Sequence, residues 1–454
     1  MASIIKRNGK YSVVLNYTDA DGKRRQKWET FPTKKEAQAY KAKLEYSQAA
    51  GIQAFVPSAK SVDELLEEYI KNYGTQNWSH GYYYKAQSLI KHYVSPFIGK
   101  MKIKDLSPRL IENYYRNLLQ IDNALSHNQV GKKKTDTQKV SARTVKEIHK
   151  LLHSAFRQAE RWEMVETNPF DKVITPKYKE VPREIWELDD LKKALEACDN
   201  PLLELCINLA FSCSLRLGEI LGLTWDCVHI SDELINSNSA WIYVDKQLQR
   251  ITVEAAKAID SDSIRFKFPS NNTQVKTILV LKDPKTKSSV RKIFLPRTVA
   301  EMLRERKKQI DTYKNYLGDE YHDYKLVICY ENGTPMEQDK IRQFFQKLIK
   351  DNDLRPVVFH SLRHSSTTYT LKLSGGDIKA VQGDTGHAEA AMITERYAHI
   401  LDDDRRINAE KFEEMFYQQK NNEAPNGKAD ELLSIMKKLQ ESPELLELLK
   451  GLIK

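Results

Sequence analysis

The chain has 454 residues, 41% of them hydrophobic and 30% charged, and a formal net charge of +10 at pH 7. This length exceeds one ordinary core, and we predict three domains. Its apolar runs are too short to cross a bilayer, and the first residues lack a signal peptide's apolar stretch, so we expect a cytoplasmic protein that does not insert into membranes. The positive charge favours a polyanionic partner without separating DNA from RNA or a membrane surface.

The five cysteines have no Cys-x-x-Cys spacing and are odd in number. They are Cys198, Cys206, Cys213, Cys227 and Cys329. This pattern is typical of buried thiols in a reducing compartment, and we predict no structural metal and no disulfide frame.

Residues 1–46 carry eleven basic and five acidic side chains, a local net charge of +6. Three strands are predicted at 4–7, 11–17 and 23–30, because turn signals separate these segments at Asn8-Gly9 and at residues 19–22. A capping box at residues 33–36 then opens a helix that ends near residue 46. We expect this helix to cover one face of a small antiparallel sheet through Ala37, Tyr40 and Leu44.

The other face of this sheet is left free. A sheet with basic residues on its free face can enter a DNA major groove, where side chains read base edges and lysines hold phosphates. The alternative is that these basic residues only solvate a small domain. The candidate DNA contacts are Lys6, Arg7, Lys10, Lys23, Arg24, Arg25 and Lys27.

A linker is predicted at residues 47–60 and a helical domain at 61–174. A capping box begins at Ser61, and further helices are indicated at 79–93, from Ser107-Pro108 and at 141–162. The consecutive tyrosines Tyr82, Tyr83 and Tyr84 are candidate contacts to a DNA backbone, although we expect at least two of them to pack in the hydrophobic core instead. Residues 121–140 form a polar loop with three consecutive lysines, which is either close to DNA or simply solvated.

A second linker spans residues 175–183 and contains two further candidate DNA contacts, Lys177 and Lys179. The next domain is predicted at 184–416. Its apolar spacing predicts a buried helix over residues 201–213, which places Arg216 just beyond the end of that helix, three residues before Glu219. In isolation such a pair would be an ordinary surface ion pair.

Strand-like segments at 241–244 and 275–281 predict an enlarged sheet at the domain edge. Residues 283–293 follow, and they fit a β-hairpin that presents a lysine at its tip. The register of a hairpin is not fixed by sequence, so Lys282, Lys285 and Lys287 all remain candidates for this position.

Residues 360–399 contain the remaining candidate catalytic residues. His360 and Arg363 are three apart on one helical turn, so both can reach one anion. A Gly-His pair ends at His387, and ten residues later Tyr397 offers a phenol that can attack phosphorus if cations stabilise its oxyanion.

In this order, an arginine, a lysine, His-x-x-Arg, Gly-His and a tyrosine resemble the tyrosine recombinase (phage integrase) family. The resemblance makes Arg216, Lys285, His360, Arg363, His387 and Tyr397 the catalytic set, with Glu219 supporting Arg216. Lys285 matches the family's lysine best because it lies in the Lys-Thr pair. The family's usual Thr-Gly before the arginine is Cys213-Ser214 here, which we expect to alter the turn but not to abolish the site. His364 and His399 are expected to be structural.

The resemblance also implies a multidomain α+β fold. A small sheet with one helix resembles the family's arm-site-binding domain, residues 61–174 its helical core-binding domain, and 184–416 its mainly α catalytic domain with a small antiparallel sheet. Implied partners are double-stranded DNA with core-type and arm-type sites, a homotetramer on DNA and an accessory excision factor. No cofactor and no metal are implied, and the location would be the nucleoid of a bacterial host.

The last segment, 417–454, is predicted to form two short helices with apolar stripes. By resemblance they would dock on a neighbouring protomer, and packing on their own domain is the alternative. For the whole chain, the implied activity is site-specific recombination that integrates and excises a mobile element. A DNA-binding regulator that does not cut, or a topoisomerase that uses the same phosphotyrosine step, are the alternatives.

Overall fold

The computed structural model describes residues 2–7, 9–18, 24–49, 59–124, 139–178, 184–259, 261–269, 276–284, 286–374 and 377–385. The chain divides into two compact units. One combines Met1–Pro182 with Gln249–Val280, and the other combines Arg183–Leu248 with Leu281–Lys454. The predicted tail and the polar loop around residues 132–134 lie outside the described residues.

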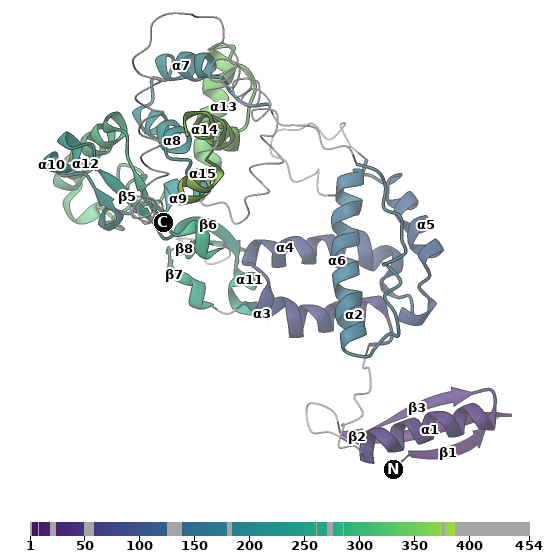
Figure 1. The fold of residues 1–454 in the computed structure, drawn as a ribbon. Coiled ribbons are helices and arrows are strands. Elements are labelled where there is room, and N and C mark those ends of the chain that lie inside the picture. Colours follow the sequence, from purple (N-terminus) through teal and green to yellow (C-terminus); the bar gives the residue numbers. More distant parts are fainter. Residues whose placement is uncertain are drawn as a thin grey trace, which may run out of the picture. The chain divides into compact units, whose positions relative to one another are not determined.

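The N-terminal domain is an antiparallel sheet in the order β1-β2-β3, with one helix across it (Figure 1). Its elements are β1 (Ala2–Arg7), β2 (Lys10–Thr18), β3 (Arg24–Phe31) and α1 (Lys34–Ala49). The Thr33 hydroxyl accepts the Glu36 N–H at 3.3 Å at the start of α1. Val13, Leu15 and Ala37 form the core, and Tyr40 and Leu44 pack against it. The predicted three strands and covering helix are confirmed.

The helical domain follows. Its elements are α2 (Val62–Tyr69), η1 (Ile70–Gly74), α3 (Thr75–Asn77), α4 (His80–Leu89), η2 (Ile90–Gly99), η3 (Ile103–Asp105), α5 (Pro108–Leu118) and α6 (Ala142–Arg161). Serine side chains accept backbone N–H groups at the N-termini of α2, α4, α5 and α6, which satisfies donors that a helix cannot pair internally. Tyr83 is buried and Tyr82 packs against the core, whereas Tyr84 is exposed, as expected for two core tyrosines.

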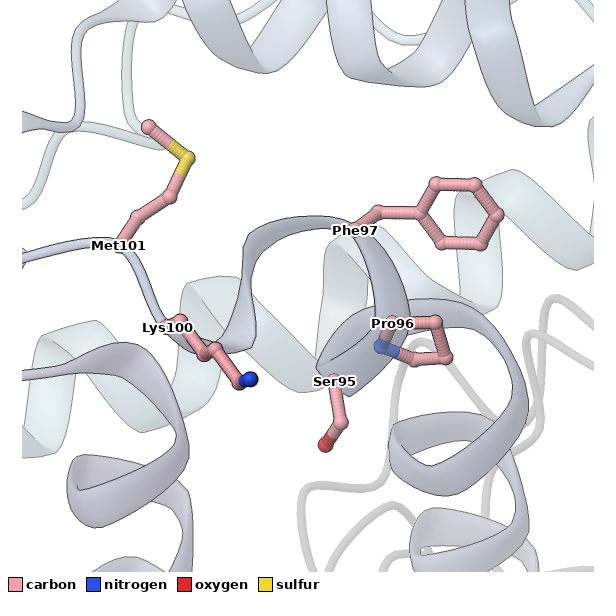
Figure 2. A pocket seen from close by; sticks show the side chains of 5 residues that line it. All are labelled: Ser95, Pro96, Phe97, Lys100 and Met101. Atoms are coloured by element: carbon pink, nitrogen blue, oxygen red, sulfur yellow. The ribbon is translucent and has the colours of Figure 1, made fainter.

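A small pocket opens in the helical domain at the end of η2. Figure 2 shows the side chains that line it, which are Ser95, Pro96, Phe97, Lys100 and Met101. The Ser95 hydroxyl donates to Asp63 Oδ1 at 2.6 Å and ties η2 to α2. Of the predicted catalytic residues that the structure describes, none lines this pocket.

Residues 249–280 pack against this helical domain. They contain α11 (Val253–Ala258), η6 (Ser261–Ser263) and β7 (Ile264–Lys267), and they share β6 (Gln247–Thr252) and β8 (Thr277–Lys282) with the second unit. Ala255 and Ile259 form a buried cluster with Tyr83 of α4, and Gln87 donates to Glu254 at 2.7 Å. Instead of one enlarged sheet, the chain forms two three-stranded sheets, β6-β8-β7 and β4-β5-β9.

The described residues of the second unit are mainly helical. Its helices are α7 (Leu188–Glu196), α8 (Pro201–Ser212), α9 (Leu217–Leu221), η5 (Trp225–Cys227), α10 (Asp232–Asn236), η7 (Lys287–Ser289), α12 (Arg297–Leu317), η8 (Gly318–Glu320), α13 (Gln338–Asp351), α14 (Phe359–Leu373) and α15 (Ile378–Thr385). Its sheet contains β4 (Val228–His229), β5 (Trp241–Val244) and β9 (Arg291–Phe294). Helices α12, α13 and α14 all contact α8, so the predicted buried helix is confirmed as the centre of this unit.

The predicted hairpin over residues 283–293 is wrong. The strands on either side of this segment belong to different sheets, since β8 pairs within β6-β8-β7 and β9 pairs with β5. Pro284 has no N–H for a ladder, and the Thr286 hydroxyl is hydrogen-bonded to the hydroxyls of Ser288 and Ser289 around η7. The segment therefore connects two different sheets.

Two further expectations concern membranes and thiols. Within the described part of the chain, no helix combines the length and the apolar character that a membrane crossing requires. All five cysteines are free thiols, and all except Cys198 are buried.

Candidate active site

Arg216 lies at the start of α9, immediately after the loop that leaves the central helix α8. Its Nη1 donates to Glu219 Oε1 at 2.7 Å, and its backbone N–H donates to Glu219 Oε2 at 3.0 Å. The Glu219 side chain is 2% exposed, whereas that of Arg216 is 35% exposed. The pair is therefore not an ordinary surface ion pair: a buried carboxylate holds a guanidinium that solvent and ligands can still reach.

Arg291, at the start of β9, reaches the same carboxylate from the other side. Its Nη2 lies 3.2 Å from Glu219 Oε2, and its Nη1 donates to the Ser289 carbonyl at 3.0 Å. Nη2 also approaches the Ser214 carbonyl at 3.5 Å. One buried guanidinium thus connects the Arg216 turn to the turn that precedes β9.

The loop at Ser214 connects Arg363 to the cluster formed by Arg216, Glu219 and Arg291. Arg363, buried in α14, donates from Nη1 to the Ser214 carbonyl, and the Ser214 and Ser366 hydroxyls are hydrogen-bonded. Ser214 has a φ of +51°, a conformation that favours glycine. Serine thus adopts a left-handed conformation here, and its carbonyl faces Arg291 and Arg363.

The electrostatic balance of this cluster is positive. Burial raises the pKa of Glu219, but the guanidinium groups of Arg291 and Arg216, the Arg216 N–H and the charge of Arg363 outweigh it, and the net pKa is below the ordinary value. One ionised carboxylate therefore faces three guanidinium groups. The surplus positive charge, with a planar fork reachable at Arg216, suits an anion such as a phosphodiester.

The lysine-bearing turn lies beside Arg216. Arg216 Nη1 donates to the Ser289 hydroxyl at 3.4 Å, and Gln247 donates to the Asp283 carbonyl at 3.1 Å. Lys282, at the end of β8, is buried, and its pKa is lowered by burial, against the charge of Asp283. Lys285 and the side chain of Lys287 lie outside the described residues.

His360 lies in the first turn of α14, and its side chain is exposed. The His364 ring meets it edge-on, with ring centroids 4.8 Å apart and an interplanar angle of 83°. The structure thus brings Arg216, Glu219 and Arg363 together and places His360 one turn from Arg363 on the same helix. His387, Tyr397 and His399 lie outside the described residues.

The candidate DNA contacts of the N-terminal sheet divide between its two faces. By strand alternation Arg7, Lys10 and Arg24 lie on the face away from α1. Lys6 instead pairs with Tyr11 and lies with Nζ 5.7 Å from that ring, so the expected free-face position is wrong for Lys6. Lys177 is exposed, and Lys23, Lys179 and the side chains of Arg25 and Lys27 lie outside the described residues.

Sequence reasoning missed Arg291. The available signal is its place in β9, where Arg291 and Ile293 are buried and Lys292 and Phe294 are exposed. A basic residue at an inward position of a short strand predicts a buried partner. Which carboxylate it would meet depends on folding across more than seventy residues and is not visible in sequence.

Arginines from three separate elements lie around one buried carboxylate, and an exposed histidine lies on the same helix as the third arginine. This arrangement defines the class of site: a cationic site suited to an anion such as a phosphodiester. Comparisons with known proteins agree with this class. The model described as "Phage integrase family" matches residues 260–404. "Phage integrase, N-terminal SAM-like domain" matches 61–119, and "Arm DNA-binding domain" matches 3–47.

Two relatives illustrate the extent of the similarity. The ICEBs1 integrase of Bacillus subtilis is 22% identical over 414 residues, which cover 90% of this chain and 98% of that protein. A "Tyrosine recombinase XerC-like" protein of Caldanaerobacter subterraneus is 25% identical over 329 residues, covering 70% of this chain and 73% of that protein.

A solved structure of the Tn1549 transposon integrase in complex with a circular intermediate DNA has the same fold. Its TM-score is 0.58 at 19% identity, covering 78% of this chain and 100% of that one. The chain belongs to the phage integrase family, the tyrosine recombinases. It is therefore an enzyme of DNA recombination.

Proposed function

We propose that this enzyme cleaves and rejoins DNA through a 3′-phosphotyrosine on Tyr397 in order to integrate and excise a mobile element. The observation that carries the proposal is the Glu219 cluster, in which Arg216, Arg291 and Arg363 surround one carboxylate. Such a cluster stabilises the charge that builds up on a phosphodiester during displacement, without reorganising at the moment of reaction.

The residues take the following roles. Tyr397 Oη attacks the scissile phosphorus and forms the new P–O bond, while the bond to the 5′ oxygen of the DNA breaks. Arg216 and Arg363 neutralise the non-bridging oxygens, and His387 donates a hydrogen bond to one of them.

Two proton transfers complete the step. His360 takes the phenolic proton, and Lys285 protonates the departing 5′ oxygen. A phosphodiester is replaced by a phosphotyrosine diester, so the step is nearly isoenergetic and needs no nucleotide. A 5′ hydroxyl from another strand reverses it and completes the exchange.

The larger assembly follows from the chemistry. Exchange between two duplexes uses four cleavage sites, so we propose a homotetramer on DNA. A separate basic domain before the helical domain supports two kinds of DNA site, core-type and arm-type. An accessory factor that favours excision is a further part of the proposal. The integrases of ICEBs1 and Tn1549, both similar to this chain, support a mobile element in a bacterial cell.

The test uses a nicked suicide duplex. This duplex carries the sequence at which the mobile element joins the chromosome, taken from next to the gene that encodes this protein. Wild-type protein should give a covalent adduct that resists denaturation, and Tyr397→Phe should give none. Arg216→Ala should bind the duplex normally but cleave about 10²–10³ more slowly. Rapid cleavage by Arg216→Ala would overturn the site assignment.

The same assay separates the alternatives. A regulator that does not cut would bind its site without any adduct from the wild type. A topoisomerase would relax supercoiled DNA that lacks a junction, at a rate that adding the junction leaves unchanged.

A further inference from the structure

The face of the N-terminal sheet that points away from α1 has a defined pattern. The register pairs Thr18 with Arg24 and Asn16 with Gln26 at one end, and Arg7 with Lys10 at the other. Two central rows lie between them, Ser3–Val14–Trp28 and Ile5–Ser12–Thr30. Cationic residues thus stand at both ends of the face, with uncharged polar, aliphatic and aromatic residues between them.

The residues between the two ends of the face differ in how exposed their side chains are. Ser12 is buried, and its hydroxyl is 2.9 Å from that of Thr30, so these two groups bond to each other. Asn16 and Gln26 are exposed, and Trp28 is 47% exposed although it is large and aromatic. The exposed indole and the two exposed carboxamides together offer an aromatic surface and hydrogen-bonding groups to a partner.

The dimensions of the face fit a DNA groove. Neighbouring strands lie about 4.8 Å apart, so three strands span about 10 Å, and the major groove is about 12 Å wide. With the strands along the groove, the cations at both ends meet phosphates and the central rows meet base edges. A carboxamide makes two hydrogen bonds with adenine in this groove, through N6 and N7, and an apolar side chain contacts the thymine methyl group.

We propose that Asn16 and Gln26 read A·T pairs in the arm-type site, that Trp28 packs on a thymine methyl group beside them, and that Arg7, Lys10 and Arg24 hold the flanking phosphates. This proposal rests on the proposed function, in which the domain binds DNA. It adds which residues recognise the DNA sequence of the arm-type site and which base they recognise. Because Asn16 and Gln26 are cross-strand partners, the two adenines that they read belong to neighbouring base pairs.

The experiment selects binding sites for the full-length protein from a pool of randomised duplexes. Wild type should enrich an arm-type motif with adenine at two neighbouring positions, in addition to a core-type motif. Gln26→Ala and Asn16→Ala should each lose the preference at one of these positions by roughly tenfold. Gln26→Glu should replace adenine by cytosine at its position, because a carboxylate accepts from cytosine N4.

Controls separate base reading from loss of the fold. Gln38→Ala removes the same side chain from an exposed position on α1 and should leave the arm-type motif unchanged. The core-type motif and cleavage of a suicide duplex without an arm-type site should stay normal in every variant. If Gln26→Glu and both alanine variants enrich the wild-type motif, the proposal is overturned. A protein that fails to cleave the core duplex would instead count against the proposed function.

Discussion

The catalytic unit and the N-terminal sheet both use basic side chains, but they place them in opposite environments. Around Glu219 the charged groups of Arg291 and Arg363 are buried and bonded to carbonyls and to the carboxylate. On the N-terminal sheet Arg7, Lys10 and Arg24 are exposed at the ends of a flat face. The first arrangement fixes positions to act on one phosphorus atom, and the second adds affinity for a long polyanion.

The difference has an energetic consequence. A buried charge is coupled to its partners, so removing one of them leaves another uncompensated. An exposed cation near phosphates contributes nearly independently, through release of counterions. Substitutions in the catalytic unit should therefore be large and non-additive, whereas those on the sheet should be small, additive and dependent on salt.

The largest effect is expected for Arg291→Met. It removes a partner of the buried Glu219 carboxylate and should lower the free energy of unfolding by about 3–5 kcal/mol, measured with urea. Cleavage should also slow, since Arg291 holds the Ser214 and Ser289 carbonyls around Arg216.

A second substitution tests whether Arg291 positions the site or only stabilises the fold. Arg291→Lys keeps the charge but loses the fork, so it should regain much of the stability and little of the single-turnover cleavage rate. If Arg291→Lys cleaves at the wild-type rate, Arg291 has no positioning role.

The features of the fold and the site that could be predicted from the sequence are those that depend on residues close together in the chain. The starts of α2, α4, α5 and α6 were predictable because each depends on a serine and the next turn. Arg216, His360 and Arg363 were predicted as site residues because each lies in a short motif and the motifs follow the order that resembles the family. Arg291 and the pairing of β8 and β9 were not, since both depend on strands distant in sequence. The turn at Ser214 shows a third case: its residue type did not reveal that its backbone would adopt a φ of +51°.

A smaller effect is expected from pH. The pKa of Glu219 is lowered in the folded protein, so its ionised form stabilises the fold above the unfolded-state pKa of about 4.3, and this contribution is lost as the pH falls through the folded pKa. Thermal unfolding of wild type and Glu219→Gln should show a large difference near neutral pH. The difference should shrink as the solution is acidified below about pH 4. A gap that stays constant with pH would mean that the carboxylate's charge does not contribute.

Ser214 allows a finer comparison within the same cluster. Ser214→Gly and Ser214→Ala both lose the hydroxyl bonded to Ser366, but only glycine adopts a positive φ without strain. We expect the glycine variant to be more stable than the alanine variant by about 0.5–1 kcal/mol in urea unfolding, after the greater freedom of glycine in the unfolded chain is counted. Equal stabilities would show that the turn relaxes when Ser214 is replaced.

The smallest effect is expected on the N-terminal sheet, for Lys10→Ala. If Lys10 holds one phosphate, its loss should weaken binding of arm-type DNA only a few-fold at moderate salt and by nearly the same factor for every sequence. It should also lower the slope of log affinity against log salt by about one. Lys35, exposed on α1, offers a matched control whose substitution by alanine should leave the slope unchanged. A loss confined to one DNA sequence would mean that Lys10 reads a base, and the contrast between a positioning cluster and an additive cationic face would then fail at this residue.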